Sequence, residues 1–126
     1  MRRNELETEN VRNAYKYAAQ KDYLQAVNYL AQELDQNSLN HLALYYKGVY
    51  MCREAISLNA KHQYYNDLKN MGLMNLKIAC ILDSLNYDYA MHLATFCRSF
   101  FIKDYEESGH KITNEMESIV DDAFVY

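Results

Sequence analysis

The stretch between Ala14 and Gly48 constrains the fold most, because its apolar residues recur three and four positions apart. Ala14 and Tyr17 stand before the pair Lys21-Asp22, and one apolar stripe follows that pair, made of Tyr23, Ala26, Val27, Leu30 and Leu34. Spacing of this kind places side chains on one face of a helix. The stretch therefore predicts two amphipathic helices that meet at Lys21-Asp22.

Composition favours helices along the whole chain. The 126 residues include no proline and three glycines, so helix ends are left to asparagine, aspartate and serine. We find no strand-like alternation longer than a few residues. The sequence therefore predicts an all-α protein, and its length fits a single domain covering residues 1–126.

We expect about six helices in three pairs. The predicted segments run from about Asn4 to Gln20, from Tyr23 to Leu34, from after Asn40 to about Asn59, from about His62 to Asp83, from Tyr89 to about Ser108, and from Asn114 to about Phe124. The fourth segment is apolar nearly all round its surface, which is typical of a buried helix. We therefore expect that helix in the middle of the domain.

The segment from Thr8 to about Asn40 resembles a tetratricopeptide repeat (TPR). Its length is close to the repeat period of about 34 residues, and Ala14, Tyr17 and Ala26 match the small and tyrosine positions of the repeat. The second unit is about a dozen residues longer than a repeat of this family, and the third starts at Tyr89. The resemblance implies antiparallel helix hairpins stacked as a short, right-handed, TPR-like array.

The resemblance also implies a function and a site. In this family the first helices of the hairpins line a concave groove that binds a peptide or a helix of another protein. Carried onto this chain, the groove residues are Val11, Tyr15, Ala18, Leu42, Tyr45, Val49, Arg53, His92, Phe96 and Phe100. We therefore expect a non-catalytic interaction module that acts as an adaptor, chaperone or scaffold.

The residues that could carry chemistry lack the spacing that chemistry requires. Four histidines and three cysteines are scattered along the chain, without the paired spacing of a zinc site. Cys80 lies in an apolar helix, which does not activate a thiol. We expect no catalytic residue, no metal and no cofactor.

Charge and hydropathy narrow the possible partners. A net charge of −4 disfavours nucleic acid. No apolar run is long enough to span a bilayer, and the amino end lacks the pattern of a secretory signal, so we expect a cytoplasmic protein.

Thirteen tyrosines leave two interpretations open. Adjacent tyrosines such as Tyr45-Tyr46 and Tyr64-Tyr65 cannot both face one core, so one of each pair is expected near the surface. Exposed tyrosines fit a partner interface as well as simple packing over a helix seam. The alternative function is a constitutive subunit of a larger assembly, or a homodimer that uses these tyrosines as permanent contacts.

Overall fold

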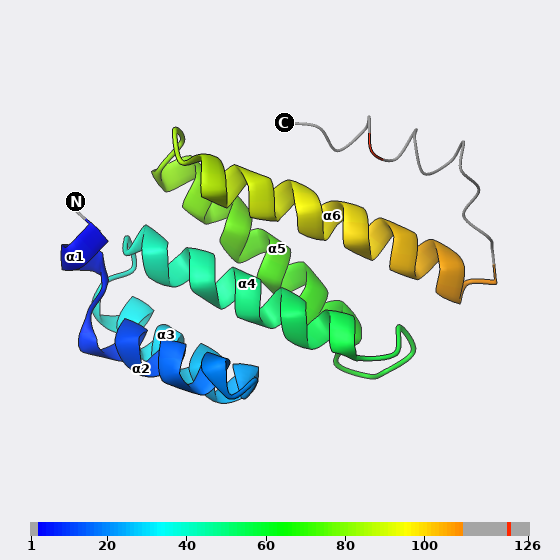
Figure 1. Cartoon of the computed structure of the whole chain (residues 1–126), viewed down its shortest axis with the longest axis horizontal. Helices are drawn as coiled ribbons and strands as arrows, with labels where there is room; N and C mark the ends of the chain where they lie inside the picture. The colour runs from blue at the N-terminus through cyan, green and yellow to red at the C-terminus, as the bar shows by residue number, and fades with distance from the viewer. Residues whose placement is uncertain (1–2, 110–120, 122–126) are drawn as a thin grey trace.

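The computed structural model describes residues 3–109 and 121, and this part of the chain is built from helices joined by short turns (Figure 1). The helices are α1 (Arg3–Leu6), α2 (Glu9–Ala19), α3 (Tyr23–Gln36), α4 (His41–Ser57), α5 (Tyr65–Leu82) and α6 (Tyr87–Glu107). From α2 onward each helix packs antiparallel against the next. The all-α prediction is confirmed.

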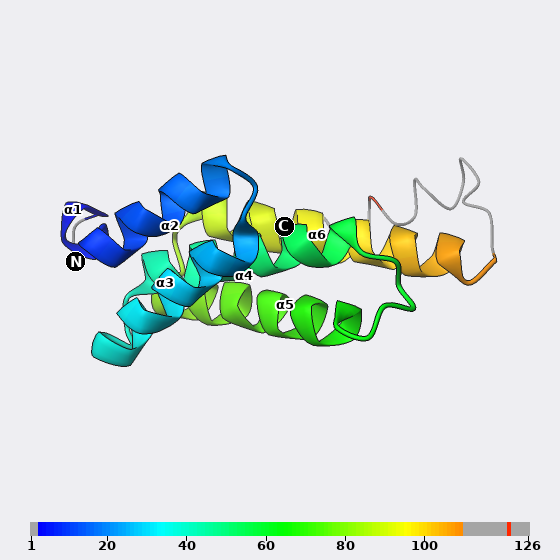
Figure 2. The same cartoon turned by 90° about the horizontal axis from the view of Figure 1, so that it is seen from below.

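The core lies around α4. Ten of its residues are buried, more than on any other described helix. It packs against α3 on one side and α5 on the other, and α1 and α6 also touch it (Figures 1 and 2). The sequence analysis expected the helix near His62–Asp83 in the middle, and this was wrong. That helix, α5, buries one face and leaves the other exposed.

The first predicted helix is two helices in the structure. We expected one helix from Asn4 to Gln20, but α1 ends at Leu6 and α2 begins at Glu9. Thr8 between them has an extended backbone with ψ of 176°. Its hydroxyl donates a hydrogen bond of 2.5 Å to Glu33 on α3. This contact between residues distant in sequence stabilises the extended backbone that separates α1 from α2. The predicted helix from Asn114 lies outside the described residues, except for Asp121, which is helical.

Polar residues cap the helices, as the absence of proline led us to expect. The side chains of Asp22, Asn40 and Asn86 each accept a hydrogen bond from a backbone N–H in the first turn of the helix that follows. The turn before α3 also holds Lys21 at a φ of 61°, a left-handed conformation that is uncommon outside glycine. These short turns keep consecutive helices close together.

A pair of glycines lets α4 and α5 approach closely. A Cβ atom placed on Gly48 would lie 2.7 Å from the Cγ atom of Leu76 and 2.8 Å from the carbonyl oxygen of Gly72. A Cβ atom on Gly72 would lie 2.7 Å from the sulfur of Cys52. Both positions therefore require glycine, because backbone atoms occupy the space that a side chain would need.

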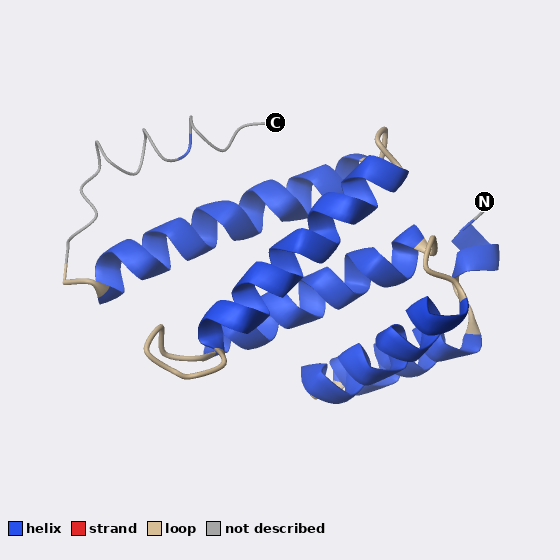
Figure 3. Ribbon diagram, turned by 180° about the vertical axis from the view of Figure 1, so that it is seen from behind, coloured by secondary structure: helices blue, strands red, loops and turns tan. Residues whose placement is uncertain are grey.

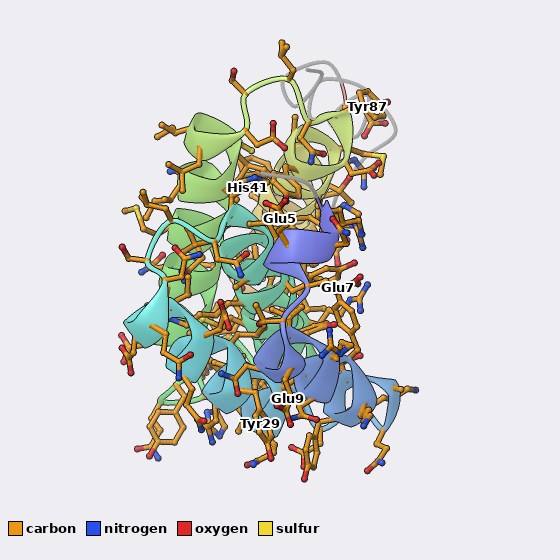
Figure 4. The ribbon with its side chains drawn as sticks, turned by 90° about the vertical axis from the view of Figure 1, so that its left-hand side faces the viewer. Glu5, Glu7, Glu9, Tyr29, His41 and Tyr87 are labelled. Carbon is orange, nitrogen blue, oxygen red and sulfur yellow. The ribbon has the colours of Figure 1, made fainter. Side chains whose placement is uncertain are left out.

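A buried polar network joins α1, α3 and α4. The Asn40 side chain is fully buried, and its amide donates to Glu33 at 3.0 Å and to the carbonyl oxygen of Leu6 at 2.8 Å. Its carbonyl oxygen accepts from the N–H of Ala43. Glu33 is also buried and accepts from Thr8 and Asn40 at the same time. Figure 4 looks onto this end of the molecule and labels Glu5 on α1 and His41 at the start of α4; Arg3 and Leu6 of α1 line one small hollow together with His41.

We predict that Gly48→Ala lowers the free energy of unfolding by about 1–3 kcal/mol, because the added methyl group forces α4 and α5 apart. The higher helix propensity of alanine acts in the opposite direction by about 1 kcal/mol. Urea unfolding followed by circular dichroism measures the change. The control is Arg53→Ala on the exposed side of the same helix, which should stay within about 0.5 kcal/mol of the wild type. Equal stability of Gly48→Ala and the wild type would contradict the close crossing.

We also predict that Asn40→Ala costs more stability than Asn86→Ala, although both residues cap a helix. Loss of a cap costs about 1 kcal/mol in either variant. Asn40→Ala also removes one of the two donors to the buried Glu33 carboxylate and the donor to the Leu6 carbonyl, so its total loss should reach about 2–4 kcal/mol. The same unfolding experiment compares the two variants. Equal losses would show that the buried network contributes nothing beyond the cap.

Candidate functional site

The ten residues predicted to line a groove are mostly part of the core. Six of them are buried, namely Val11, Leu42, Tyr45, Val49, Phe96 and Phe100. Tyr15, Ala18 and His92 are partly buried, and Arg53 is exposed. The buried six are held by packing between neighbouring helices, so a partner could not reach them in this conformation. A groove along these residues remains a prediction, and its accessible part is limited to the other four.

Aromatic rings connect the helices across this region. Tyr45 on α4 stacks on Tyr89 of α6 with ring centroids 4.5 Å apart, and it meets Tyr46 edge-on at 4.8 Å. Tyr46 in turn meets Tyr15 on α2 edge-on at 4.9 Å. Aromatic pairs in these geometries stabilise beyond the area that they bury. The tyrosines at this site therefore hold α2, α4 and α6 together.

The hydroxyl groups of these rings have specific polar neighbours. The Tyr45 hydroxyl lies 3.0 Å from Nδ1 of His92, and the Tyr89 hydroxyl lies 2.8 Å from Nδ1 of His41. Arg3 donates to the hydroxyl of Tyr46 at 3.2 Å. His41 and His92, whose spacing fits no zinc site, thus satisfy tyrosine hydroxyls at the edge of the core.

The other adjacent tyrosine pair behaves as predicted. Tyr65 is buried, whereas Tyr64 is 57% exposed. The Tyr65 hydroxyl donates to Asp104 on α6 at 2.5 Å, and Lys69 donates to the second oxygen of the same carboxylate at 3.0 Å. This arrangement joins the start of α5 to the end of α6.

The described cysteines and histidines form no chemical centre. Within residues 3–109 and 121, no three side chains of the His, Cys, Asp and Glu types come together as a metal site. Burial raises the pKa of the Cys52 thiol to about 12 and also raises the pKa values of Cys80 and Cys97. Their thiolate forms are therefore disfavoured near neutral pH. No helix of the described part has the length and apolar character needed to cross a membrane.

Of the eleven exposed large apolar residues in the described part of the chain, six lie on α5 or just after it, where the sequence analysis expected a buried helix. We call this surface the α5 seam, and it consists of Met71, Met74, Ile78, Ile81, Leu82 and the following Leu85. Ile81 is 76% exposed and Leu85 is 95% exposed. Figures 2 and 3 agree that α5 lies at the edge of the molecule, with no described helix over its outer side. The seam is therefore open to a partner.

A signal for the seam was present in the sequence. Met71, Met74, Ile78, Ile81 and Leu85 are spaced alternately by three and four residues, which is the a and d pattern of a heptad. The residues that face the core, such as Gly72, Leu76 and Ala79, fall on a different side of the helix. Sequence reasoning grouped both sets as one apolar surface because nothing in the sequence showed which set meets α4.

The tyrosine pKa values predict how stability depends on pH. Burial, followed by the neighbouring Tyr46, raises the pKa of Tyr45 and of Tyr50 to about 12. In the unfolded chain tyrosine ionises near pH 10. Stability should therefore be complete below about pH 10 and fall as the pH rises from about 10 to 12, because only the unfolded chain loses these protons in that interval.

Ultraviolet absorbance of tyrosinate, recorded against pH for the native chain and for the chain in urea, measures the two titrations. The native curve should lag behind the unfolded one at alkaline pH. Superimposed curves would contradict the buried placement of Tyr45 and Tyr50.

Comparison of the chain with protein-family models, with curated proteins and with solved structures finds no match. The position and contacts of each residue in this structure are therefore the basis for its role.

Proposed function

We propose that this chain is a non-catalytic protein-interaction module, a short TPR-like array of helix hairpins that serves as an adaptor, chaperone or scaffold by holding a helix of another chain. The observation that carries the proposal is the α5 seam. Its six apolar residues are each between 37% and 95% exposed, and contiguous apolar patches on the order of a few hundred Å² on a soluble monomer are often functional. Surfaces of this size are typical of interaction sites.

The shape of the seam favours a helical partner. Its apolar residues follow the long axis of α5, so an amphipathic helix laid against α5 would cover them with its own apolar face. Between Met71 and Leu82 the only charged residue of α5 is Lys77. A partner helix would therefore bury almost no charge there. The favourable free energy of apolar burial would not be reduced by the cost of desolvating charged side chains.

The alternative function, a constitutive subunit of a larger assembly, has the same surface in its favour. Permanent interfaces are more apolar than transient ones, and the α5 seam is almost wholly aliphatic. The exposed Tyr64 lies next to the start of α5 and would extend such an interface.

The predicted groove is the alternative binding surface to the α5 seam. Arg53 on α4 is its exposed member, and the partly buried Tyr15, Ala18 and His92 are the other accessible ones. Arg53 would orient a partner bound there. The seam and the groove lie on different helices, so a probe placed on each of them distinguishes the two binding modes.

We predict that a photo-crosslinking amino acid placed at Lys77 captures a protein in the native cell, whereas one placed at Lys16 does not. Lys77 borders the seam and Lys16 lies on the exposed side of α2, so the two variants probe two surfaces of one folded chain. Capture at Lys77 should disappear when Ile81→Asp is added, because a charge in the seam opposes burial. Mass spectrometry identifies the products.

A third variant with the crosslinker at Arg53 tests the groove. Capture at Arg53 and not at Lys77 would move the binding site from the seam to the groove. Capture at none of the three positions would overturn the proposed function.

A further inference from the structure

We infer that the occupant of the α5 seam is a second copy of this chain, which packs its own α5 antiparallel across a two-fold axis between Ile78 and Ile81. This inference rests on the proposed function, because it names the partner of the same surface. It differs from the homodimer considered above, because the contact is aliphatic and lies on α5, not on exposed tyrosines.

The spacing of the seam is self-complementary. In an antiparallel pair of helices, a positions of one helix pack against d positions of the other. With the axis between Ile78 and Ile81, Ile78 of each copy meets Ile81 of the other. Leu85, in the turn after the end of α5 at Leu82, lies toward Met74 of the other copy. Each contact occurs twice, as a two-fold axis requires. All four residues are exposed in the single chain.

The shape of the seam surface is compatible with the same antiparallel register. Leu85, at 95% exposure, projects from the turn after α5. A hollow of about 380 Å³ opens at the other end of the seam and is lined by Lys47, Asn70, Met71, Met74 and Asn75. The two-fold axis places Leu85 of the second copy toward Met74, beside this hollow. One chain thus carries both a projecting side chain and a recess that can receive it.

The exposed area of the seam allows a dimer of the smallest stable kind. Complete coverage of the seam on both copies would bring the buried area to at most roughly 1,200 Å², the lower limit for a specific interface. The helix is also already formed, because its other face packs against α4 through Gly72, Leu76 and Ala79. Association therefore does not have to order α5. The loss of conformational entropy on binding is then smaller than when two isolated, unfolded segments form helices and pair.

The carboxyl-terminal segment is a poorer occupant than a second copy. Asp121 is the one described residue beyond Gly109, and it pairs with Arg98 on α6. This contact places Asp121 beside α6. A second copy, in contrast, presents an apolar helix of the right length with no acidic residue between Met71 and Leu82.

Analytical ultracentrifugation of the full chain over a concentration series tests the inference. We expect a dimer at micromolar concentration, and we expect Ile81→Asp to raise the dissociation constant about 100-fold or more. The matched control is Leu24→Asp, which changes a leucine of similar exposure to those of the seam but on α3, and which should leave the dimer intact. Circular dichroism establishes that both variants are folded. A wild-type chain that stays monomeric, or a control that dissociates equally, would overturn the inference.

Mixing two variants tests the antiparallel register. Ile78→Asp and Ile81→Lys should each weaken self-association, because each places an unpaired charge in both halves of its own interface. In a mixed dimer, Asp at position 78 of one copy meets Lys at position 81 of the other, and the second half of the interface keeps its two isoleucines. The mixture should therefore associate at least tenfold more tightly than either variant alone. In a parallel pair position 78 would meet 78 and position 81 would meet 81, so mixing would relieve only the like-charge contacts and leave one unpaired charge in each layer. A recovery of less than tenfold would overturn the register.

The two proposals fail differently. A monomeric wild-type chain, together with crosslinking at Lys77 to a different protein, would overturn the second copy and leave the interaction function standing. Absence of both dimer and crosslinks would overturn both.

Discussion

The close crossing of α4 and α5 at Gly48 and Gly72 is the contact on which the rest of the structure depends. Because neither glycine has a side chain, the helices meet backbone to backbone, and Leu76 and Cys52 fill the space beside the crossing. This contact fixes the rotation of α5 about its own axis. Once Gly72 faces α4, Leu76 and Ala79 must also face inward. Met71, Met74 and Ile78 are left outside, so the same contact that builds the core also creates the exposed seam.

Sequence reasoning succeeded where the evidence is local. The hairpin of α2 and α3 follows from apolar spacing and from the polar pair Lys21-Asp22, and both helices lie where that spacing places them. The same reasoning failed at Thr8, because the hydroxyl that interrupts the helix there is bound by Glu33, 25 residues away. The sequence analysis predicted one helix from about Asn4 to Gln20, and nothing in the sequence revealed the competing tertiary contact.

The candidate site was less predictable than the fold for a related reason. The TPR resemblance assigns residues to an inner face, but how much of that face stays open depends on how closely the helices pack. Here Tyr45 is enclosed between Tyr46, Tyr89 and His92, so it stabilises the packing of the helices from within. The seam was missed for the opposite reason. A helix with apolar residues on two sides can bury either one, and only the position of Gly72 opposite Gly48 decides between them.

The buried network around Asn40 affects how the packed helices would respond to removal of α1. In an ideal repeat protein each unit contacts only its neighbours, so a terminal unit can be removed with modest effect on the rest. In this chain Asn40 spans from the Leu6 carbonyl to the first turn of α4. Deleting α1 would remove the Leu6 carbonyl that accepts from the Asn40 amide, and the amide would keep only its hydrogen bond to Glu33. The short helix α1 thus stabilises the start of α4 through Asn40. We therefore expect α1, α2, α3 and α4 to unfold together.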